Sequence, residues 1–208
     1  MYRVHPASSK PDDDEAQIPT TAGSGSPSQW TVWKKSSMAF HGTDGFSIYD
    51  GKGNLAYRVD NYSRKHKCFE GELLLMDGHG KALISLRPQI LSMHDRWSGF
   101  RGGDGRPAFS MRRRRSIVLQ SCDAVEVFVE SPHRGGGAAA PDFRTEGCFR
   151  RRSCKIVDRE GGEVARISRK EVSNKAVTLG DDVFSLVVQP SVDADLVMAF
   201  LVIMDRIC

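Results

Sequence analysis

The sequence lacks several features that would place it in a membrane, secreted or metal-binding class. No part of the 208-residue chain holds the ~20 consecutive apolar residues that a membrane-spanning helix needs. Residues 1–6 contain no apolar signal region, so secretion is not expected. The cysteines are odd in number and form no C-x-x-C pair, which argues against a zinc site. We therefore expect a reducing compartment with free thiols at Cys68, Cys122, Cys148, Cys154 and Cys208.

Catalytic and cofactor motifs are absent as well. The glycines form no G-x-x-x-x-G-K-[ST] loop that would cradle a phosphate. His94 and Asp95 are neighbours, and neighbouring side chains of a strand point to opposite faces, so the two would not pair. No serine or cysteine can be placed beside them as a nucleophile, and the other histidines show no metal-ligand spacing. We therefore expect no catalytic residue, no metal and no cofactor.

One apolar stretch stands out near the end of the sequence, where no residue from Leu196 to Met204 is polar. A helix that is apolar all round must be buried in a core or in lipid, and this run is about half of the ~20 residues that lipid requires. Asp193 and Asp195 precede the run and Arg206 follows it, as the helix dipole favours. The β-branched residues would also allow a strand, but length and terminal charges favour a buried helix of ~14 residues.

Small, polar and proline residues dominate residues 1–29, which include an acidic run at 12–15. Such a segment cannot bury enough apolar surface to fold, so we expect a disordered N-terminal tail. A regulatory role is the alternative to a solvated leader. Residues 30–208 are expected to form a single domain.

A strand–turn–strand pattern occurs three times. In each copy an Asp opens the turn and a Gly follows three residues later: Asp50 and Gly53, Asp77 and Gly80, Asp158 and Gly161. The Asp side chain can accept hydrogen bonds from nearby backbone N–H groups, and Gly adopts the positive φ that such turns need. Calcium binding is the alternative, but one carboxylate per turn falls short of an EF-hand loop. We interpret the copies as hairpins of antiparallel strands.

Further strands are predicted from apolar and β-branched segments. They are residues 30–34, 90–94, 109–111, 117–119, 125–130 and 183–188. Residues 102–107 and 131–141 are expected to be loops, and no segment before Ser191 shows helical periodicity. Many short antiparallel strands and one apolar helix predict a mainly β protein, in which a closed antiparallel β-barrel encloses the C-terminal helix.

Two arginine runs are the sharpest charge features of a chain whose formal net charge is +4. Arginine suits phosphate because its planar guanidinium can donate two parallel hydrogen bonds. A strand would divide each run between two faces. The alternatives to an anion or lipid site are solvated charge that blocks edge-strand aggregation and a nuclear address. The candidate anion- or lipid-binding residues are Arg112, Arg113, Arg114, Arg115, Arg150, Arg151 and Arg152.

Several short segments occur in an order that carries a family likeness. They are residues 30–34 (WTVWK), 44–46 (DGF), 53–62 (GNLAYRVDNY), 75–77 (LMD), 92–97 (SMHDRW), 147–149 (GCF), 179–184 (LGDDVF) and 205–207 (DRI). With these segments the chain resembles the plant LURP-one-related family, part of the tubby C-terminal-like superfamily. The resemblance implies about twelve strands in a barrel around a hydrophobic C-terminal helix.

Less follows for function, since no motif carries the tubby phosphoinositide ligands onto positions of this chain. The resemblance and the arginine runs together imply a non-enzymatic module that binds anionic phospholipid headgroups, or a protein partner in plant defence signalling. The alternative is a nucleic-acid-associated or membrane-tethered transcription regulator, which would need a basic face with interleaved aromatic residues. We expect a monomer without a transmembrane segment, located in the cytoplasm, in the nucleus or at the membrane periphery.

Overall fold

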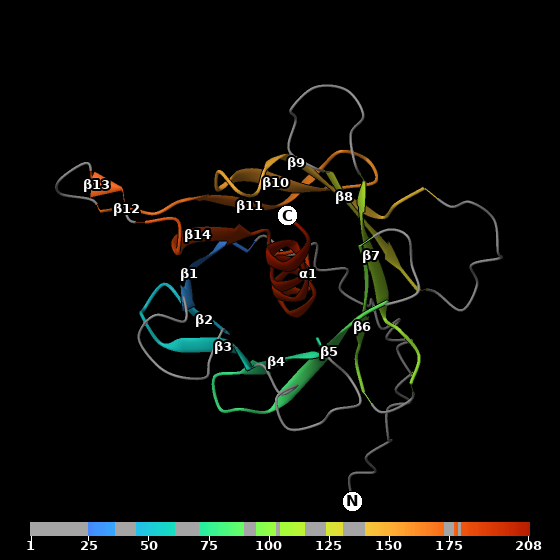
Figure 1. Ribbon diagram of the computed structural model, residues 1–208. Helices are drawn as coiled ribbons and strands as arrows, with labels where there is room; N and C mark the ends of the chain where they lie inside the picture. The colour runs from blue at the N-terminus through green and yellow to red at the C-terminus, as the bar shows by residue number, and fades with distance from the viewer. Residues whose placement is uncertain are drawn as a thin grey trace, which may run out of the picture.

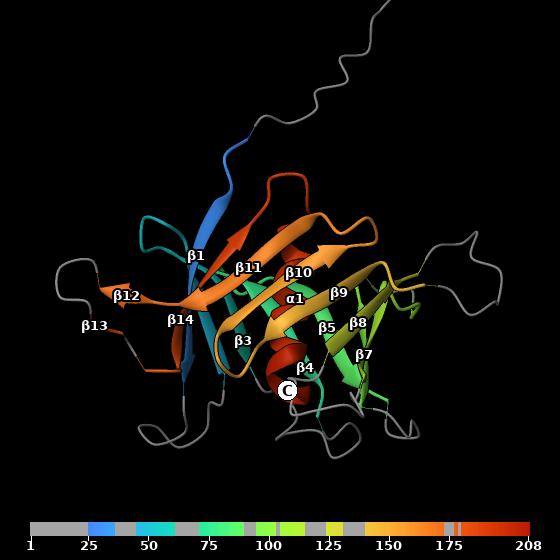
Figure 2. The same cartoon turned by 90° about the horizontal axis from the view of Figure 1, so that it is seen from above.

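Strands dominate the protein. The computed structural model describes residues 25–35, 45–60, 71–89, 95–102, 105–114, 124–130, 140–172, 177–178 and 180–208. Twelve strands of these ranges close into an antiparallel barrel in the order β1-β14-β11-β10-β9-β8-β7-β6-β5-β4-β3-β2. Their bounds are β1 Ser28–Lys35, β2 Gly45–Tyr49, β3 Leu55–Asp60, β4 Leu73–Asp77, β5 Ala82–Pro88, β6 Arg96–Phe100, β7 Phe109–Arg114, β8 Ala124–Val129, β9 Phe143–Cys148, β10 Ser153–Asp158, β11 Glu163–Arg169 and β14 Val183–Val188. The short strands β12 (Glu171–Val172) and β13 (Val177–Thr178) pair with each other and project from the barrel wall (Figure 2).

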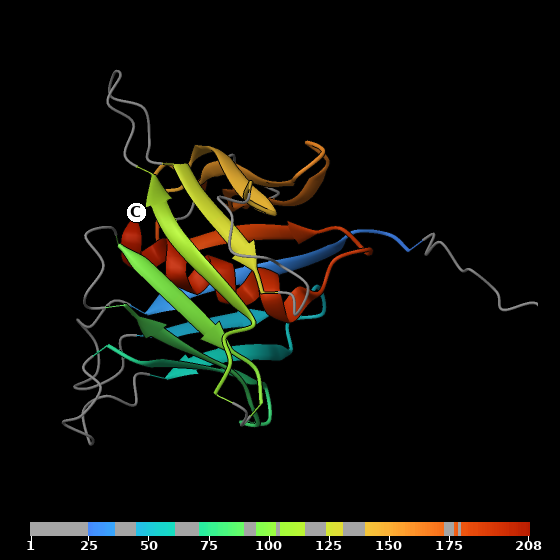
Figure 3. The same cartoon turned by 90° about the vertical axis from the view of Figure 1, so that its right-hand side faces the viewer.

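The helix α1 (Ala194–Ile207) passes through the centre of the barrel (Figure 1) and runs between opposite walls in the side view (Figure 3). Asp193 is its N-cap, and the Asp193 side chain accepts a hydrogen bond from the N–H of Asp195 at 2.9 Å. Residues 197–204 and Ile207 are buried, so no face of this part of the helix meets water. The predicted buried helix is confirmed, and the strand alternative is wrong.

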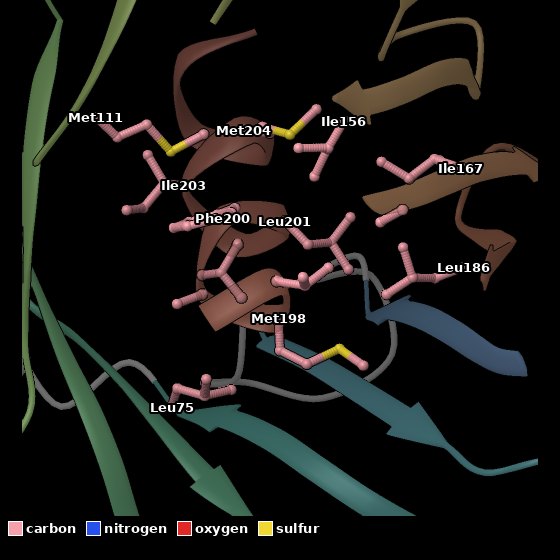
Figure 4. Packing of buried hydrophobic residues seen from close by; sticks show 14 of the residues in the cluster. Leu75, Met111, Ile156, Ile167, Leu186, Met198, Phe200, Leu201, Ile203 and Met204 are labelled. Atoms are coloured by element: carbon pink, nitrogen blue, oxygen red, sulfur yellow. The ribbon is translucent and has the colours of Figure 1, made fainter. Parts of the chain in front are cut away.

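The helix and the inner face of the barrel share one core. In Figure 4, Met198, Phe200 and Met204 of α1 leave the helix in different directions toward side chains of the wall. Phe200 meets Phe109 of β7 edge to face, with ring centroids 5.0 Å apart and an interplanar angle of 83°. The lumen is therefore filled by side chains around its whole circumference, as a fully apolar helix requires.

The three Asp turns have the hydrogen bonds expected from the sequence. Asp50 Oδ1 accepts from two backbone N–H groups of its own turn, both at 2.8 Å. Asp77 Oδ1 does the same at 2.9 Å, and Asp158 Oδ1 at 3.0 and 2.7 Å. The matching glycines have φ of +86°, +89° and +92°. The hairpin interpretation is confirmed. In the described ranges no group of His, Cys, Asp and Glu side chains could hold a metal ion.

Most predicted strands are present, and some are longer than expected. The segments at 109–111, 125–130 and 183–188 correspond to β7, β8 and β14. The segment at 30–34 belongs to β1, which begins at Ser28, inside the part expected as tail. Strands expected at 90–94 and 117–119, the loop at 131–139 and the tail at 1–24 lie outside the described residues. The strands β6 and β9 were not expected.

The cysteines do not all behave as the sequence indicated. Cys154 and Cys208 are free thiols, and burial raises the pKa of Cys154 to about 12, so this thiol stays protonated. Cys148 is disulfide-bonded, so the expectation of a free thiol is wrong there. Cys68 and Cys122 lie outside the described residues.

Polar side chains of the wall hold the N-terminal end of α1. Arg101 Nη1 lies 2.8 Å from Asp193 Oδ2, and Arg101 Nη2 lies 3.7 Å from Asp195 Oδ2. The hydroxyl of Tyr57 donates to Asp195 Oδ1 at 3.0 Å. Burial alone would raise the pKa of Asp193, but the hydrogen bond and charge of Arg101 outweigh it and hold that pKa below its usual value.

We expect Arg101→Gln to change the dependence of stability on pH. A carboxylate with a lowered pKa stabilises the fold above its unfolded pKa of about 3.9, and this contribution is lost as pH falls through the folded pKa. Because the pair is partly exposed, the variant should be less stable at pH 7 by less than about 1 kcal/mol. Below both pKa values the two proteins should converge. Urea unfolding at several pH values measures this, with the exposed Arg106→Gln as control. A difference that persists unchanged in acid would contradict the assignment.

Candidate functional site

The strand β7 divides the first arginine run between its two faces. Phe109 and Met111 point into the core and are fully buried, so Arg112 and Arg114 extend from the outer wall. Arg113 lies on the same, inward-facing side of the strand as Met111. Its side chain is 22% exposed, and its Nη1 lies 3.7 Å from Asp95 Oδ2. Arg115 lies outside the described residues. Of the three arginines of this run that the structure describes, two, Arg112 and Arg114, therefore lie on the outer wall.

Both outer arginines converge on one carboxylate of the neighbouring strand. Glu126 of β8 stands opposite Arg112 in the register, and Arg112 donates through Nε at 2.8 Å and Nη2 at 2.6 Å to Glu126 Oε2. Arg114 Nη1 lies 3.4 Å from Glu126 Oε1. The Arg112 guanidinium also lies over the ring of Phe128, 4.8 Å from its centroid. These contacts hold Arg112 in one orientation while 40% of its side chain stays exposed.

A third arginine joins them from β6. The register places Arg96 directly opposite Arg112, so both side chains extend from the same face of the sheet. Arg96 makes no ion pair with a carboxylate in the part of the chain that the structure describes. Arg112 and Arg114 share the carboxylate of Glu126, and Arg96 adds a third positive charge, so the three arginines and Glu126 have a formal charge of +2. We call Arg96, Arg112 and Arg114 the outer arginine surface.

The second arginine run occupies the turn between β9 and β10, and Arg152 in this turn is buried. Its φ is +51°, and its guanidinium lies between the rings of Phe149 and Phe184, 4.5 and 4.1 Å from their centroids. Arg152 Nε donates to the carbonyl of Asp181 at 3.0 Å, and Nη2 lies 3.8 Å from Asp205 Oδ1. Desolvation lowers the pKa of Arg152, although the charge of Asp205 opposes this. The expectation of a surface ligand contact is thus wrong for Arg152, which is a structural side chain.

The other two residues of this run have separate contacts. Arg150 Nε donates to the carbonyl of Cys208, the C-cap of the helix, where the helix dipole favours a cation. The side chain of Arg151 is exposed, and its carbonyl accepts from Arg169 Nε at 3.3 Å. The run therefore does not form one continuous surface.

Arg96 is the member of the surface that the sequence did not identify. It precedes the run by 16 positions along the chain, and only the β6–β7 hairpin register brings it opposite Arg112. The sequence pattern that could have placed Arg96 on the wall is an alternation of inward and outward side chains in a strand at residues 96–100. Two features weaken that signal: Gly99 faces the core, and Ser98 is buried although it is polar.

No helix in the described ranges is long and apolar enough to cross a bilayer. On the neighbouring strands β9 and β10, Arg144 and Lys155 lie 3.1 and 3.0 Å from the carboxylate of Glu146.

Comparisons with known proteins agree with the barrel and its central helix. A chain in an X-ray structure of a protein from Arabidopsis thaliana superimposes with a TM-score of 0.58 at 23% identity, covering 86% of this chain and 90% of that one. At this identity the likeness shows the fold.

Sequence similarity extends to curated plant proteins. "Protein LURP-one-related 5" of Arabidopsis thaliana is 38% identical over 84% of this chain and 80% of that protein. "Protein LURP-one-related 12" and "Protein LURP-one-related 8" of the same organism are each 35% identical, over 83% and 85% of this chain and 75% and 85% of their own lengths. The family described as LURP-one-related matches residues 28–205. The chain therefore belongs to the LURP-one-related family.

Proposed function

We propose that the protein is a non-enzymatic binding module that uses the outer arginine surface to bind anionic phospholipid headgroups. The observation that carries the proposal is the register of Arg96 and Arg112, two like charges directly opposite each other on neighbouring strands. Such a pair lowers stability unless an anion lies between the charges. Glu126 compensates only part of the charge, because it already binds Arg112 and Arg114.

The orientation of the side chains in the outer arginine surface also suits a phosphate group. Arg112 is held by Glu126 and Phe128, so little side-chain entropy is lost when a headgroup binds. Arg114 is 74% exposed and free to adjust to the ligand. An anionic membrane contributes about 1 kcal/mol for each nearby arginine, so three arginines contribute about 3 kcal/mol. This corresponds to millimolar affinity, and we expect reversible, salt-sensitive association at the membrane periphery.

A role in plant defence signalling is part of the same proposal. It rests on the family resemblance alone, because the printed names of the plant relatives state no role, ligand or activity. The outer arginine surface lies on the wall strands β6 and β7, not on a helix or a projecting ribbon that could enter a groove of a nucleic acid, so lipid binding is the function that this surface favours.

Vesicle co-sedimentation tests the proposal. Wild-type protein should pellet with vesicles of phosphatidylcholine and phosphatidylserine that carry a phosphoinositide, and should stay in solution with phosphatidylcholine alone. Arg96→Ser/Arg114→Ser should bind roughly 30-fold more weakly, since it removes about 2 kcal/mol. Arg112 is kept because its loss would leave Glu126, whose side chain is 10% exposed, without its main partner.

The matched control is Arg159→Ser/Arg166→Ser. It removes the same charge from two exposed arginines outside the outer arginine surface, which are paired with Asp142 and Glu163. The control should bind almost as well as wild type. An equal loss in both variants would show that net charge, and not the outer arginine surface, attracts the protein. Equal pelleting with neutral vesicles would exclude headgroup recognition.

A further inference from the structure

A second surface feature lies on another part of the wall. An open groove of about 470 Å³ runs along the outer side of β1 and the turn between β2 and β3. Its residues are Gln29, Thr31, Trp33, Tyr49, Asp50, Gly51, Gly53 and Lys170. We call these residues the aromatic groove. Its volume is within the range of about 300–1,000 Å³ that is usual for binding sites.

The aromatic groove exists because the side chains of β1 point alternately into the core and outward. Val32 faces the core and is fully buried, so Thr31 and Trp33 extend outward. The Trp33 side chain is 52% exposed, although tryptophan side chains in folded proteins are on average highly buried. The register sets Tyr49 of β2 beside Thr31, which adds a second aromatic ring. Tyr and Trp are the residues most enriched at the energetic centres of protein interfaces.

The positive charge in the groove comes from Lys170. Its Nζ lies 3.3 Å from Thr31 Oγ1, and within the described ranges it makes no ion pair with a carboxylate. Asp50 also lines the groove, but its Oδ1 accepts from the N–H groups of Lys52 and Asn54, and its Oδ2 from Asn54 Nδ2. The groove therefore offers aromatic surface beside one cation, Lys170, that pairs with no carboxylate among the described residues.

The position of the groove decides between lipid and protein as its occupant. In the strand order β1 and β7 lie half a turn of the barrel apart, and Figure 1 shows them on opposite sides of α1. A flat bilayer that touches the outer arginine surface cannot also touch Trp33. The groove then faces away from the membrane, toward other proteins.

We propose that the aromatic groove binds an extended segment of a partner protein, with a bulky apolar side chain against Trp33 and Tyr49 and a carboxylate at Lys170. Gln29 and Thr31 supply the polar groups that hydrogen-bond to the peptide backbone. The choice of a protein over a lipid rests on the proposed membrane-facing role of the opposite wall. The aromatic and charge preferences rest on the groove alone.

A display library of random peptides, panned against the full chain, supplies the probes. We expect enriched sequences that combine an aromatic or large aliphatic residue with a nearby Asp or Glu. A labelled synthetic peptide of the enriched sequence should bind about 30-fold more weakly to Trp33→Ala and about 5-fold more weakly to Lys170→Gln in fluorescence anisotropy. In NMR spectra the indole N–H of Trp33 should shift on binding, while those of the buried Trp97 and the inward-facing Trp30 should not.

Control variants keep this test separate from that of lipid binding. Arg159→Ser/Arg166→Ser should bind the peptide like wild type, and Trp33→Ala should still pellet with anionic vesicles.

Peptides that bind Trp33→Ala and Lys170→Gln as tightly as wild type would overturn the proposal. So would a synthetic peptide of residues 1–24 that occupies the groove when no library sequence does, because the occupant would then be this chain's own N-terminal segment. Loss of vesicle binding in Trp33→Ala would assign the groove to lipid and overturn it as well.

Discussion

Phe200→Ala is expected to lower the free energy of unfolding by about 3–5 kcal/mol, the usual cost of removing a buried phenylalanine. Phe200 is 1% exposed at the middle of α1. Its ring contacts Phe109 at 5.0 Å and Phe143 at 5.7 Å, so the change opens a cavity between the helix and two strands of the wall. These strands are held in the closed barrel and cannot collapse onto the gap. Urea unfolding followed by circular dichroism measures the difference.

The matched control is Leu196→Ala in the first turn of the same helix. Leu196 is only partly buried, so its truncation should cost clearly less than that of Phe200. A similar cost at both positions would mean that the centre of the lumen is not closely packed. A loss below about 1 kcal/mol at Phe200 would contradict the buried position of the helix.

Asp205→Asn is expected to cost about 3–5 kcal/mol, because it removes one partner of a buried ion pair. Asp205 is 10% exposed and lies 3.1 Å from Lys34 Nζ and 3.8 Å from Arg152 Nη2. Arg152 is itself 7% exposed, and without Asp205 its charge would keep the carbonyl of Asp181, two aromatic rings and the weaker electrostatic effects of Asp181 and Asp182. Asn keeps the shape of the side chain, so the change tests the charge.

The control for this change is Asp181→Asn. Asp181 is 68% exposed and pairs with Arg169 at 3.6 Å, so its loss should cost well under 1 kcal/mol, as is usual for surface pairs (about 0–1 kcal/mol). The double variant Asp205→Asn/Arg152→Met should be more stable than the sum of the two single changes predicts. Strict additivity would show that the two charges do not interact.

The parts of the fold that follow local rules could be predicted from the sequence. The run around Leu201 has no polar face, so only a surrounding wall could bury it. The three Asp turns depend on contacts within five residues, and all three formed as expected.

Elements whose inner face is not apolar could not be predicted. In β6 a glycine, Gly99, faces the core because a Cβ at this position would overlap the ring of Phe109. In β9, Gly147 has φ of +94° and the hydroxyl of Thr145 accepts a hydrogen bond from the N–H of Val125 at 2.8 Å. Both strands therefore lack the alternation that marks a half-buried strand.

The candidate site depends on relations between strands, which a single sequence does not show. The strand alternation divided the arginine run as physical reasoning predicted, but the partners of Arg112 and the burial of Arg152 follow from register and from the position of the helix end. The aromatic groove likewise depends on Lys170, which is 139 positions from Thr31 along the chain.

The place of α1 in the chain order has a consequence for biosynthesis. All twelve wall strands precede it, so a ribosome completes every one of them before the residues that occupy the lumen leave the exit tunnel. Until then the apolar side chains of the inner face have no helix to pack against and are exposed to solvent. The complete core can therefore form only after the last residues of the chain have been synthesised, and the many pairings between distant strands favour slow folding.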